Sequence, residues 1–139
     1  MADNSRLFQV NVISPDRIFY TGEADMIELT TTEGDLGIYK HHIPLTAIVA
    51  PGVLKIKKDD EEKVAALLDG FIEILPDEVI ILAESCEWPE EIDVNRAQES
   101  KLRAERRLGG TEGEVNSVRA EGALRRSLIR LEIAKEYHK

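Results

Sequence analysis

The character of the chain changes at Pro89, and this change limits the possible folds more than any other feature of the sequence. Before it, short segments rich in β-branched residues are separated by turn signals such as Pro51-Gly52. After it, β-branched residues become fewer, and residues that favour helices become more frequent. The sequence therefore predicts a β domain over residues 1–88 and a helical domain over residues 89–139.

The first domain has the pattern of short strands. The segment FQVNV, residues 8–12, alternates apolar and polar side chains, which is typical of a half-buried strand. SPDR, residues 14–17, indicates a turn because proline fixes φ and the aspartate can bond its own backbone. Short strands with frequent turn signals favour a sandwich or a barrel. A loop is expected at residues 32–37, and breaks between strands are expected near Asp69-Gly70 and Pro76-Asp77.

The second domain has the pattern of two helices. Asp93 can act as the N-cap of the first helix, and Gly109-Gly110 can end it because glycine tolerates a left-handed conformation. Thr111 and Glu114 fit a capping box for the second helix. We therefore expect an αα-hairpin. Its apolar stripes are expected to be Val94, Ala97, Lys101, Ala104 and Leu108 on the first helix, and Leu124, Leu128 and Leu131 on the second.

Gly122 does not fit the helical pattern around it. A glycine inside a helix costs about 1 kcal/mol relative to alanine. It either permits a close approach between the helices or marks a point where the second helix breaks.

Charge is distributed unevenly along the chain. The net charge is −9, which argues against general nucleic-acid binding. Residues 1–93 carry a net charge of −13, whereas residues 94–139 carry +4 and eight of the ten arginines. The two domains therefore have different electrostatic roles.

The sequence contains no recognisable catalytic motif. It has no P-loop, no G-x-S-x-G, no H-E-x-x-H and no G-x-G-x-x-G. Cys86 is the single cysteine, and the histidines are too scattered for a metal triad. The N-terminus lacks the apolar core of a signal peptide, and no run of 18 apolar residues occurs. We expect a cytosolic, non-catalytic protein without a metal, which can still dock on a membrane complex.

The arginines of the second domain follow a regular spacing. They recur at i, i+7 and i+11 on both helices, so antiparallel packing can bring two rows to one cleft. One interpretation is a solvated basic face whose surface ion pairs contribute little. The other is an anion site, because guanidinium groups match phosphate bidentately and a helix N-terminus adds free N–H groups. The rows are Arg96, Arg103 and Arg107, and Arg119, Arg126 and Arg130.

Three segments carry a resemblance to a known family. EGDLGIYKHHIPL, residues 33–45, resembles the G-x-L-G-I…H-x-P-L signature of the epsilon subunit of bacterial F-type ATP synthase. VISPDRIFYTGEAD before it and DGFIEILPDEVIILAE after it are also similar to that family. The resemblance covers essentially the whole chain.

This resemblance implies a ten-stranded β-sandwich followed by an antiparallel two-helix hairpin. It further implies a non-catalytic subunit of the central stalk, peripheral on the cytoplasmic face of the cell membrane. The implied partners are the gamma subunit, the c-ring and the catalytic alpha and beta subunits. Asp35 and His42 are the implied partner contacts. An extended hairpin would inhibit ATP hydrolysis, and bound ATP would favour the folded hairpin.

The segment at residues 92–97 resembles the I/L-D-x-x-R-A motif of the ATP-binding epsilon subunits of bacilli. By this resemblance ATP, with or without Mg²⁺, lies between the folded helices and the β domain. The implied contacts of the base and ribose are Ile92, Asp93, Arg96 and Ala97. The other implied nucleotide contacts are Glu87, Arg103, Arg126 and Arg130.

Two other hypotheses remain open on the sequence. In the first, the hairpin is purely an inhibitory protein–protein element that binds ATP too weakly to matter. In the second, a separate sandwich module uses basic helices to bind nucleic acid, although its acidic first domain counts against this. A nucleotide titration tests the first hypothesis, and a salt-dependent gel shift tests the second.

Overall fold

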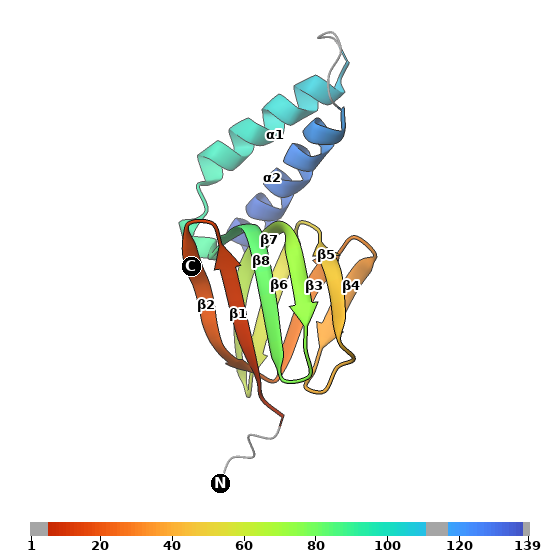
Figure 1. The fold of residues 1–139 in the computed structure, drawn as a ribbon. Coiled ribbons are helices and arrows are strands. Elements are labelled where there is room, and N and C mark those ends of the chain that lie inside the picture. Colours follow the sequence, from red (N-terminus) through yellow and green to blue (C-terminus); the bar gives the residue numbers. More distant parts are fainter. Residues whose placement is uncertain (1–5, 111–116, 138–139) are drawn as a thin grey trace. The chain divides into compact units, whose positions relative to one another are not determined.

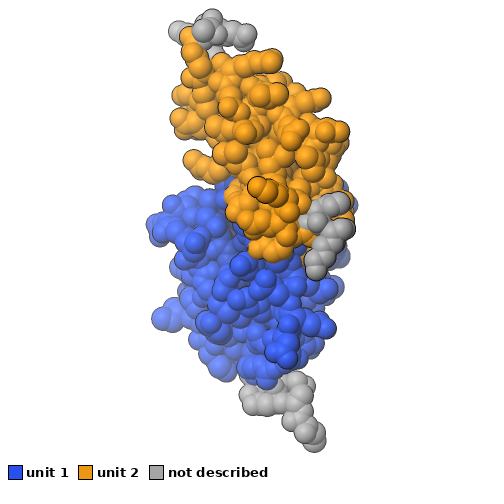
Figure 2. All heavy atoms as spheres, turned by 180° about the vertical axis from the view of Figure 1, so that it is seen from behind, with its two compact units in different colours: residues 1–87 blue, residues 88–139 orange. Residues whose placement is uncertain are grey.

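The computed structural model describes residues 6–110 and 117–137 of the chain. It consists of two compact units, the sandwich unit (residues 1–87) and the hairpin unit (residues 88–139), which are coloured separately in Figure 2. One predicted feature, the capping box of Thr111 and Glu114, lies outside the described residues.

The sandwich unit is built from eight strands in its described part (Figure 1). They are paired in the order β2-β1-β8-β7-β5-β3-β4, and β6 pairs with both β3 and β7. β1 and β8 run parallel, whereas the neighbouring pairs are antiparallel. The strands are β1 Phe8–Ser14, β2 Arg17–Ala24, β3 Met26–Thr31, β4 Gly34–Ile38, β5 Leu45–Val49, β6 Gly52–Lys58, β7 Glu61–Ile74 and β8 Glu78–Glu87.

Fewer strands form than the ten expected, and one reason lies in β7. The predicted break at Asp69-Gly70 is wrong, because β7 continues through both residues. Their φ angles of 63° and 140° bend the strand without ending it. A Cβ at Gly70 would collide with the carbonyl oxygen of Leu82, so only glycine fits there. The bend lets one strand pair with β6 in its first half and with β5 in its second.

The core of the sandwich unit follows the predicted period of two. Phe8, Val10 and Val12 are buried along β1, as the FQVNV pattern predicts. Ile27 and Ile72 are also buried, and their strands supply further apolar side chains. The predicted turn between β1 and β2 forms at residues 14–17. There the Ser14 hydroxyl donates to Asp16 over 2.7 Å, and this hydrogen bond lowers the pKa of the exposed Asp16 carboxyl.

The hairpin unit contains a short 3-10 helix and two α-helices. These are η1 Pro89–Glu91, α1 Val94–Leu108 and α2 Ser117–Tyr137. The two α-helices pack against each other and run antiparallel, and η1 also packs on α2 (Figure 1). No helix in the described part of the chain combines the length and the apolar character needed to cross a membrane.

Most of the residues that are buried at the seam of α1 and α2 have small side chains. On α1 the buried residues are Ala97 and Ala104, both from the predicted stripe, whereas Val94 and Leu108 of that stripe are exposed. The prediction that leucines form the core face of α2 is wrong. Leu128 is 45% exposed, and Leu124 and Leu131 are only half-buried. The physical reason is spacing: small residues recur every seven positions on α2, which allows the helix backbones to come close. The buried residues of α2 are Ala120, Ser127, Ile133 and Ala134.

Gly122 lies within the unbroken helix α2, so the helix does not break there. A Cβ added at this position would lie 3.2 Å from Nη1 of Arg126, one turn further along. The guanidinium of Arg126 therefore covers the glycine.

Gly122→Ala is expected to stabilise the hairpin by up to about 1 kcal/mol, because alanine favours a helix more than glycine does. The new methyl group meets only the end of the flexible Arg126 side chain, which can move. Thermal unfolding followed by circular dichroism measures the effect. Gly110→Ala is the matched control, and it should destabilise because Gly110 has a φ of 77°. A lower unfolding temperature for Gly122→Ala would mean that displacing the Arg126 side chain costs more than the gain in helix propensity.

Candidate functional site

The start of α1 brings two of the predicted ATP contacts together. Asp93 is the N-cap, and its Oδ1 accepts a hydrogen bond of 3.0 Å from the backbone N–H of Arg96. The prediction that Asp93 caps this helix is confirmed. Both side chains are exposed. Because the cap uses one carboxylate oxygen and leaves the Arg96 guanidinium in solvent, the pair can still meet a polar ligand.

The segment before this cap is also held by two local hydrogen bonds. The backbone N–H of Trp88 donates to Oε1 of Glu91 over 2.8 Å, and Ile92 N–H donates to the Pro89 carbonyl over 3.3 Å. Ile92 and Ala97 are buried, so their side chains offer almost no surface to a ligand in this structure. Ile92 and Ala97 therefore pack the start of α1, and the groups accessible to a ligand there belong to Asp93 and Arg96.

The remaining predicted ATP contacts come from three elements. Arg103 is exposed on α1, whereas Arg126 and Arg130 are half-buried one turn apart on α2. Because the helices are antiparallel and α2 contacts η1, the start of α1 lies beside the C-terminal half of α2. Glu87 is the last residue of β8 and belongs to the sandwich unit. Within the described ranges, no group of three or more His, Cys, Asp and Glu side chains could hold a metal ion.

The predicted partner contacts lie at opposite ends of β4. The prediction of a loop at residues 32–37 is wrong for residues 34–37, because Gly34 begins β4 and pairs with Thr31 of β3. Asp35 is exposed, and its Oδ1 accepts a hydrogen bond of 2.9 Å from the Thr30 hydroxyl. His42 follows the other end of β4, with Nδ1 2.8 Å from the Ile43 carbonyl oxygen. The structure therefore does not bring Asp35 and His42 together.

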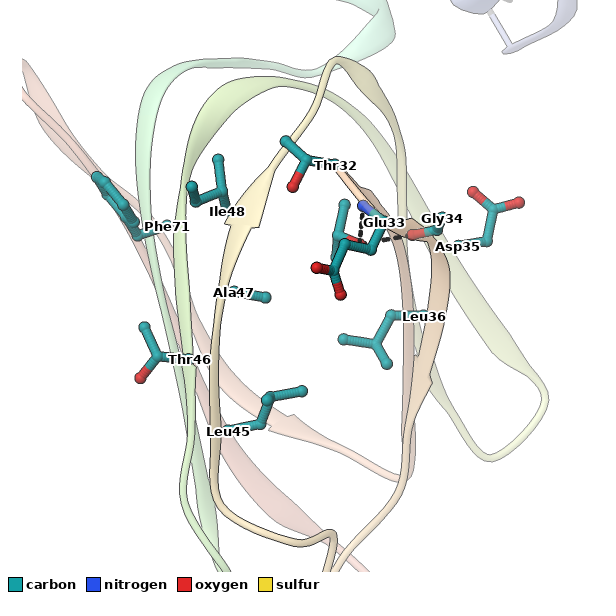
Figure 3. Close-up of a pocket in the computed structure, with 11 residues that line it drawn as sticks. Thr32, Glu33, Gly34, Asp35, Leu36, Leu45, Thr46, Ala47, Ile48 and Phe71 are labelled. Carbon is teal, nitrogen blue, oxygen red and sulfur yellow. Dashed lines mark hydrogen bonds between the residues drawn. The ribbon is translucent and has the colours of Figure 1, made fainter.

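A pocket of about 440 Å³ opens beside the Asp35 end of β4 (Figure 3). Sequence reasoning missed it, because it forms where β3 and β5 separate after the single pair Thr31–Val49. The exposed apolar residues Ile48 and Phe71 are the signal that could have indicated it. The lining residues include Thr32, Glu33, Asp35, Leu36, Ile48 and Phe71, and none of them is a predicted ATP contact.

The two units match two halves of one known family. Residues 7–89 match the family described as ATP synthase, Delta/Epsilon chain, beta-sandwich domain. Residues 90–135 match ATP synthase, Delta/Epsilon chain, long alpha-helix domain. The chain thus belongs to the delta/epsilon chain family of ATP synthase, and the predicted family and fold class are confirmed.

Individual relatives of this chain are named as epsilon chains. The ATP synthase epsilon chain of Caldanaerobacter subterraneus is 47% identical over 133 residues, which cover 95% of this chain and 96% of the relative. That of Shouchella clausii is 45% identical over 127 residues, which cover 91% and 94%. These names agree with the prediction of an ATP synthase subunit rather than a separate enzyme.

A solved structure shares the fold at lower identity. The structure of the Euglena gracilis mitochondrial ATP synthase, containing OSCP, F1 and the c-ring, has a chain that matches with a TM-score of 0.78. The identity is 20%, and the match covers 93% of this chain and 81% of that chain. It supports the arrangement of a sandwich followed by two helices within one chain.

Proposed function

We propose that this chain is a regulatory, non-catalytic epsilon subunit in the central stalk of a proton-transporting F-type ATP synthase. The observation that carries the proposal is the match of both units, in order, to relatives named ATP synthase epsilon chain. Its place would be peripheral, on the cytoplasmic face of the cell membrane. Its partners would be the gamma subunit, the c-ring and the catalytic alpha and beta subunits.

The hairpin unit would act as the regulatory element. Extended, it would block ATP hydrolysis, and folded, it would allow it. The small side chains at the seam support this, because alanines bury little apolar area and so hold the helices together weakly. The excess of arginine over residues 94–139 adds repulsion when the helices come together. A basic hairpin also complements acidic partner surfaces in the extended form.

ATP would favour the folded hairpin by binding it more tightly than the extended one, since a ligand shifts an equilibrium only by differential affinity. Its phosphates would offset the repulsion among Arg103, Arg126 and Arg130. At a concentration 100-fold above the dissociation constant, selective binding contributes about 2.7 kcal/mol. That is enough to invert a population ratio of severalfold, but not one of about ten-thousand-fold.

Calorimetric titration of ATP into the isolated chain tests this role directly. Binding, together with a shorter distance between labels on the sandwich unit and near residue 138, supports the ATP-dependent hairpin. Absence of binding favours the alternative, in which the hairpin is an inhibitory protein–protein element without meaningful ATP binding. The weak small-residue seam is compatible with both, so the titration decides between them.

The Asp35 end of β4 is proposed to contact the c-ring. A cysteine at position 35 is expected to crosslink to the c subunit in the assembled complex, because this side chain is exposed near the start of β4, beside the turn from β3. Glu23→Cys on β2 is the matched control, since Glu23 is also an exposed carboxylate. The native Cys86 is buried and should not react. No crosslink at position 35, under conditions where other subunits crosslink, would argue against this contact.

A further inference from the structure

Gly122 and Arg126 lie on one stripe of α2. They are four residues apart, and a long side chain on a helix points back toward the preceding turn, so Arg126 leans over Gly122. A Cβ added at Gly122 would have three guanidinium atoms of Arg126 as its nearest neighbours outside the local backbone. These are Nη1 at 3.2 Å, and Cζ and Nη2 at 3.9 Å each. The guanidinium therefore packs into the space that a side chain at position 122 would fill, and we call this space the Gly122 niche.

Among the described residues, neither the backbone nor the helix packing calls for glycine at this position. The φ of Gly122 is not positive and α2 is unbroken, so the backbone does not need glycine there. The approach of α1 does not need it either, because other atoms outside the local backbone lie no nearer than 3.9 Å to the added Cβ. A glycine inside a helix nevertheless makes the helix less stable than alanine would. What this glycine does accommodate is the side chain of Arg126.

The Gly122 niche turns the guanidinium away from α1. Ser127 is buried at the seam that faces α1. At about 100° per residue, Arg126 lies about 100° around α2 from Ser127, and Gly122 lies about 140° around in the same sense. Packing on Gly122 therefore holds the charged end of Arg126 further from α1 than its own backbone position requires. This placement also lowers the repulsion between Arg126 and the arginines of α1.

Arg103 of α1 projects from the same side of the hairpin as Arg126. Arg103 directly precedes the buried Ala104, and Arg126 directly precedes the buried Ser127. Because the helices are antiparallel (Figure 1), residues that precede a seam residue on either helix point to the same side of the pair. An anion held by both arginines would lie on this side, over the seam. To meet it, the Arg126 guanidinium has to leave the Gly122 niche and swing toward α1.

We propose that Gly122 lowers the affinity of the hairpin for ATP by offering the Arg126 side chain a second place to pack. Packing on α2 then competes with the ATP phosphates for the same guanidinium. This inference rests on the proposed function, in which Arg126 contacts the nucleotide. Gly122 touches no ligand itself, so it is a positioning residue that acts through Arg126. The apparent affinity falls in proportion to the fraction of hairpins whose guanidinium is outside the niche.

Filling the Gly122 niche tests the proposal. ATP is titrated by calorimetry into the full chain and into Gly122→Ala and Gly122→Leu, and thermal unfolding confirms that each hairpin is folded. Gly122→Leu should bind ATP at least about threefold more tightly than the unchanged chain, which corresponds to a guanidinium that spends about two thirds of its time or more in the niche. Gly122→Ala should show a smaller gain, because a methyl group displaces the guanidinium only partly. Helix propensity alone predicts the opposite order, since leucine favours a helix slightly less than alanine.

Arg126→Ala provides the matched background for both substitutions. Without the guanidinium, Gly122→Leu should bind ATP no more tightly than Gly122→Ala, because the gain depends on releasing Arg126. Equal affinity of the folded Gly122→Leu chain and the unchanged chain would overturn the inference alone. A loss of affinity in Gly122→Leu would also overturn it, because the niche would then hold Arg126 where ATP needs it. The same gain with and without Arg126 would overturn it as well. Absence of ATP binding in the unchanged chain and in Gly122→Leu alike would overturn the proposed ATP role together with this inference.

Discussion

Deleting residues 89–139 is expected to raise the rate of ATP hydrolysis by the assembled complex. If the extended hairpin blocks hydrolysis, only the complexes whose hairpin is not extended hydrolyse ATP before the deletion. After the deletion, all complexes can hydrolyse ATP. A preference of about 1.4 kcal/mol for the blocking state would give about a tenfold increase. The hydrolysis rate at saturating ATP measures the effect.

The deletion should leave assembly intact because the sandwich unit has its own core. Its buried residues, including Val10, Leu54 and Ile81, come from strands that pair with one another within residues 1–87. Co-purification of the truncated chain with the complex is the control. A truncated chain that assembles but leaves hydrolysis unchanged would contradict the inhibitory role of the hairpin.

The general fold could be predicted because local patterns and tertiary packing agree. The alternation in FQVNV matches burial on β1, and the turn at residues 14–17 forms where proline and aspartate predict it. Asp93 caps α1 because an aspartate before a helical segment satisfies a free backbone N–H whatever else the chain does. These signals depend on near neighbours in sequence.

The features that could not be predicted depend on distant strands or helices. Asp69-Gly70 has the sequence of a break, yet β8 pairs on both sides of it and keeps β7 continuous. The leucines of α2 suggested its core face, but the close approach of α1 buries Ser127 and alanines instead. The pairing of five strands also places exposed apolar residues opposite one another that are far apart in the sequence, namely Ile13, Ile18, Ile48, Phe71 and Leu82.

The candidate ATP site was predicted from a resemblance, and the structure supplies the local geometry against which to test it. The Asp93 carboxylate caps α1 by accepting the backbone N–H of Arg96. A variant of Asp93 can therefore weaken ATP binding by destabilising the start of the helix, without any lost contact between Asp93 and ATP. Asp93→Asn avoids this difficulty, because asparagine caps helices about as well as aspartate and lacks its charge. Asp93→Ala should lose the cap as well, at a cost of about 1 kcal/mol. Comparing the two variants separates the carboxylate's contact with ATP from its structural role.

Arg96→Ala is expected to weaken ATP binding by about 1.5–3 kcal/mol, which is about tenfold to about 150-fold, as for the loss of a charge-assisted hydrogen bond. The backbone N–H of Arg96 that meets Asp93 is retained in the variant, so the helix start should persist. Arg106→Ala is the matched control, because Arg106 is an exposed arginine of the same helix that lies about a quarter turn away from the row of Arg96 and Arg103. Calorimetry with and without Mg²⁺ measures all three proteins. Equal affinity of Arg96→Ala and the unchanged chain would remove Arg96 from the site, whereas an equal loss in both variants would indicate only a general attraction between ATP and a basic hairpin.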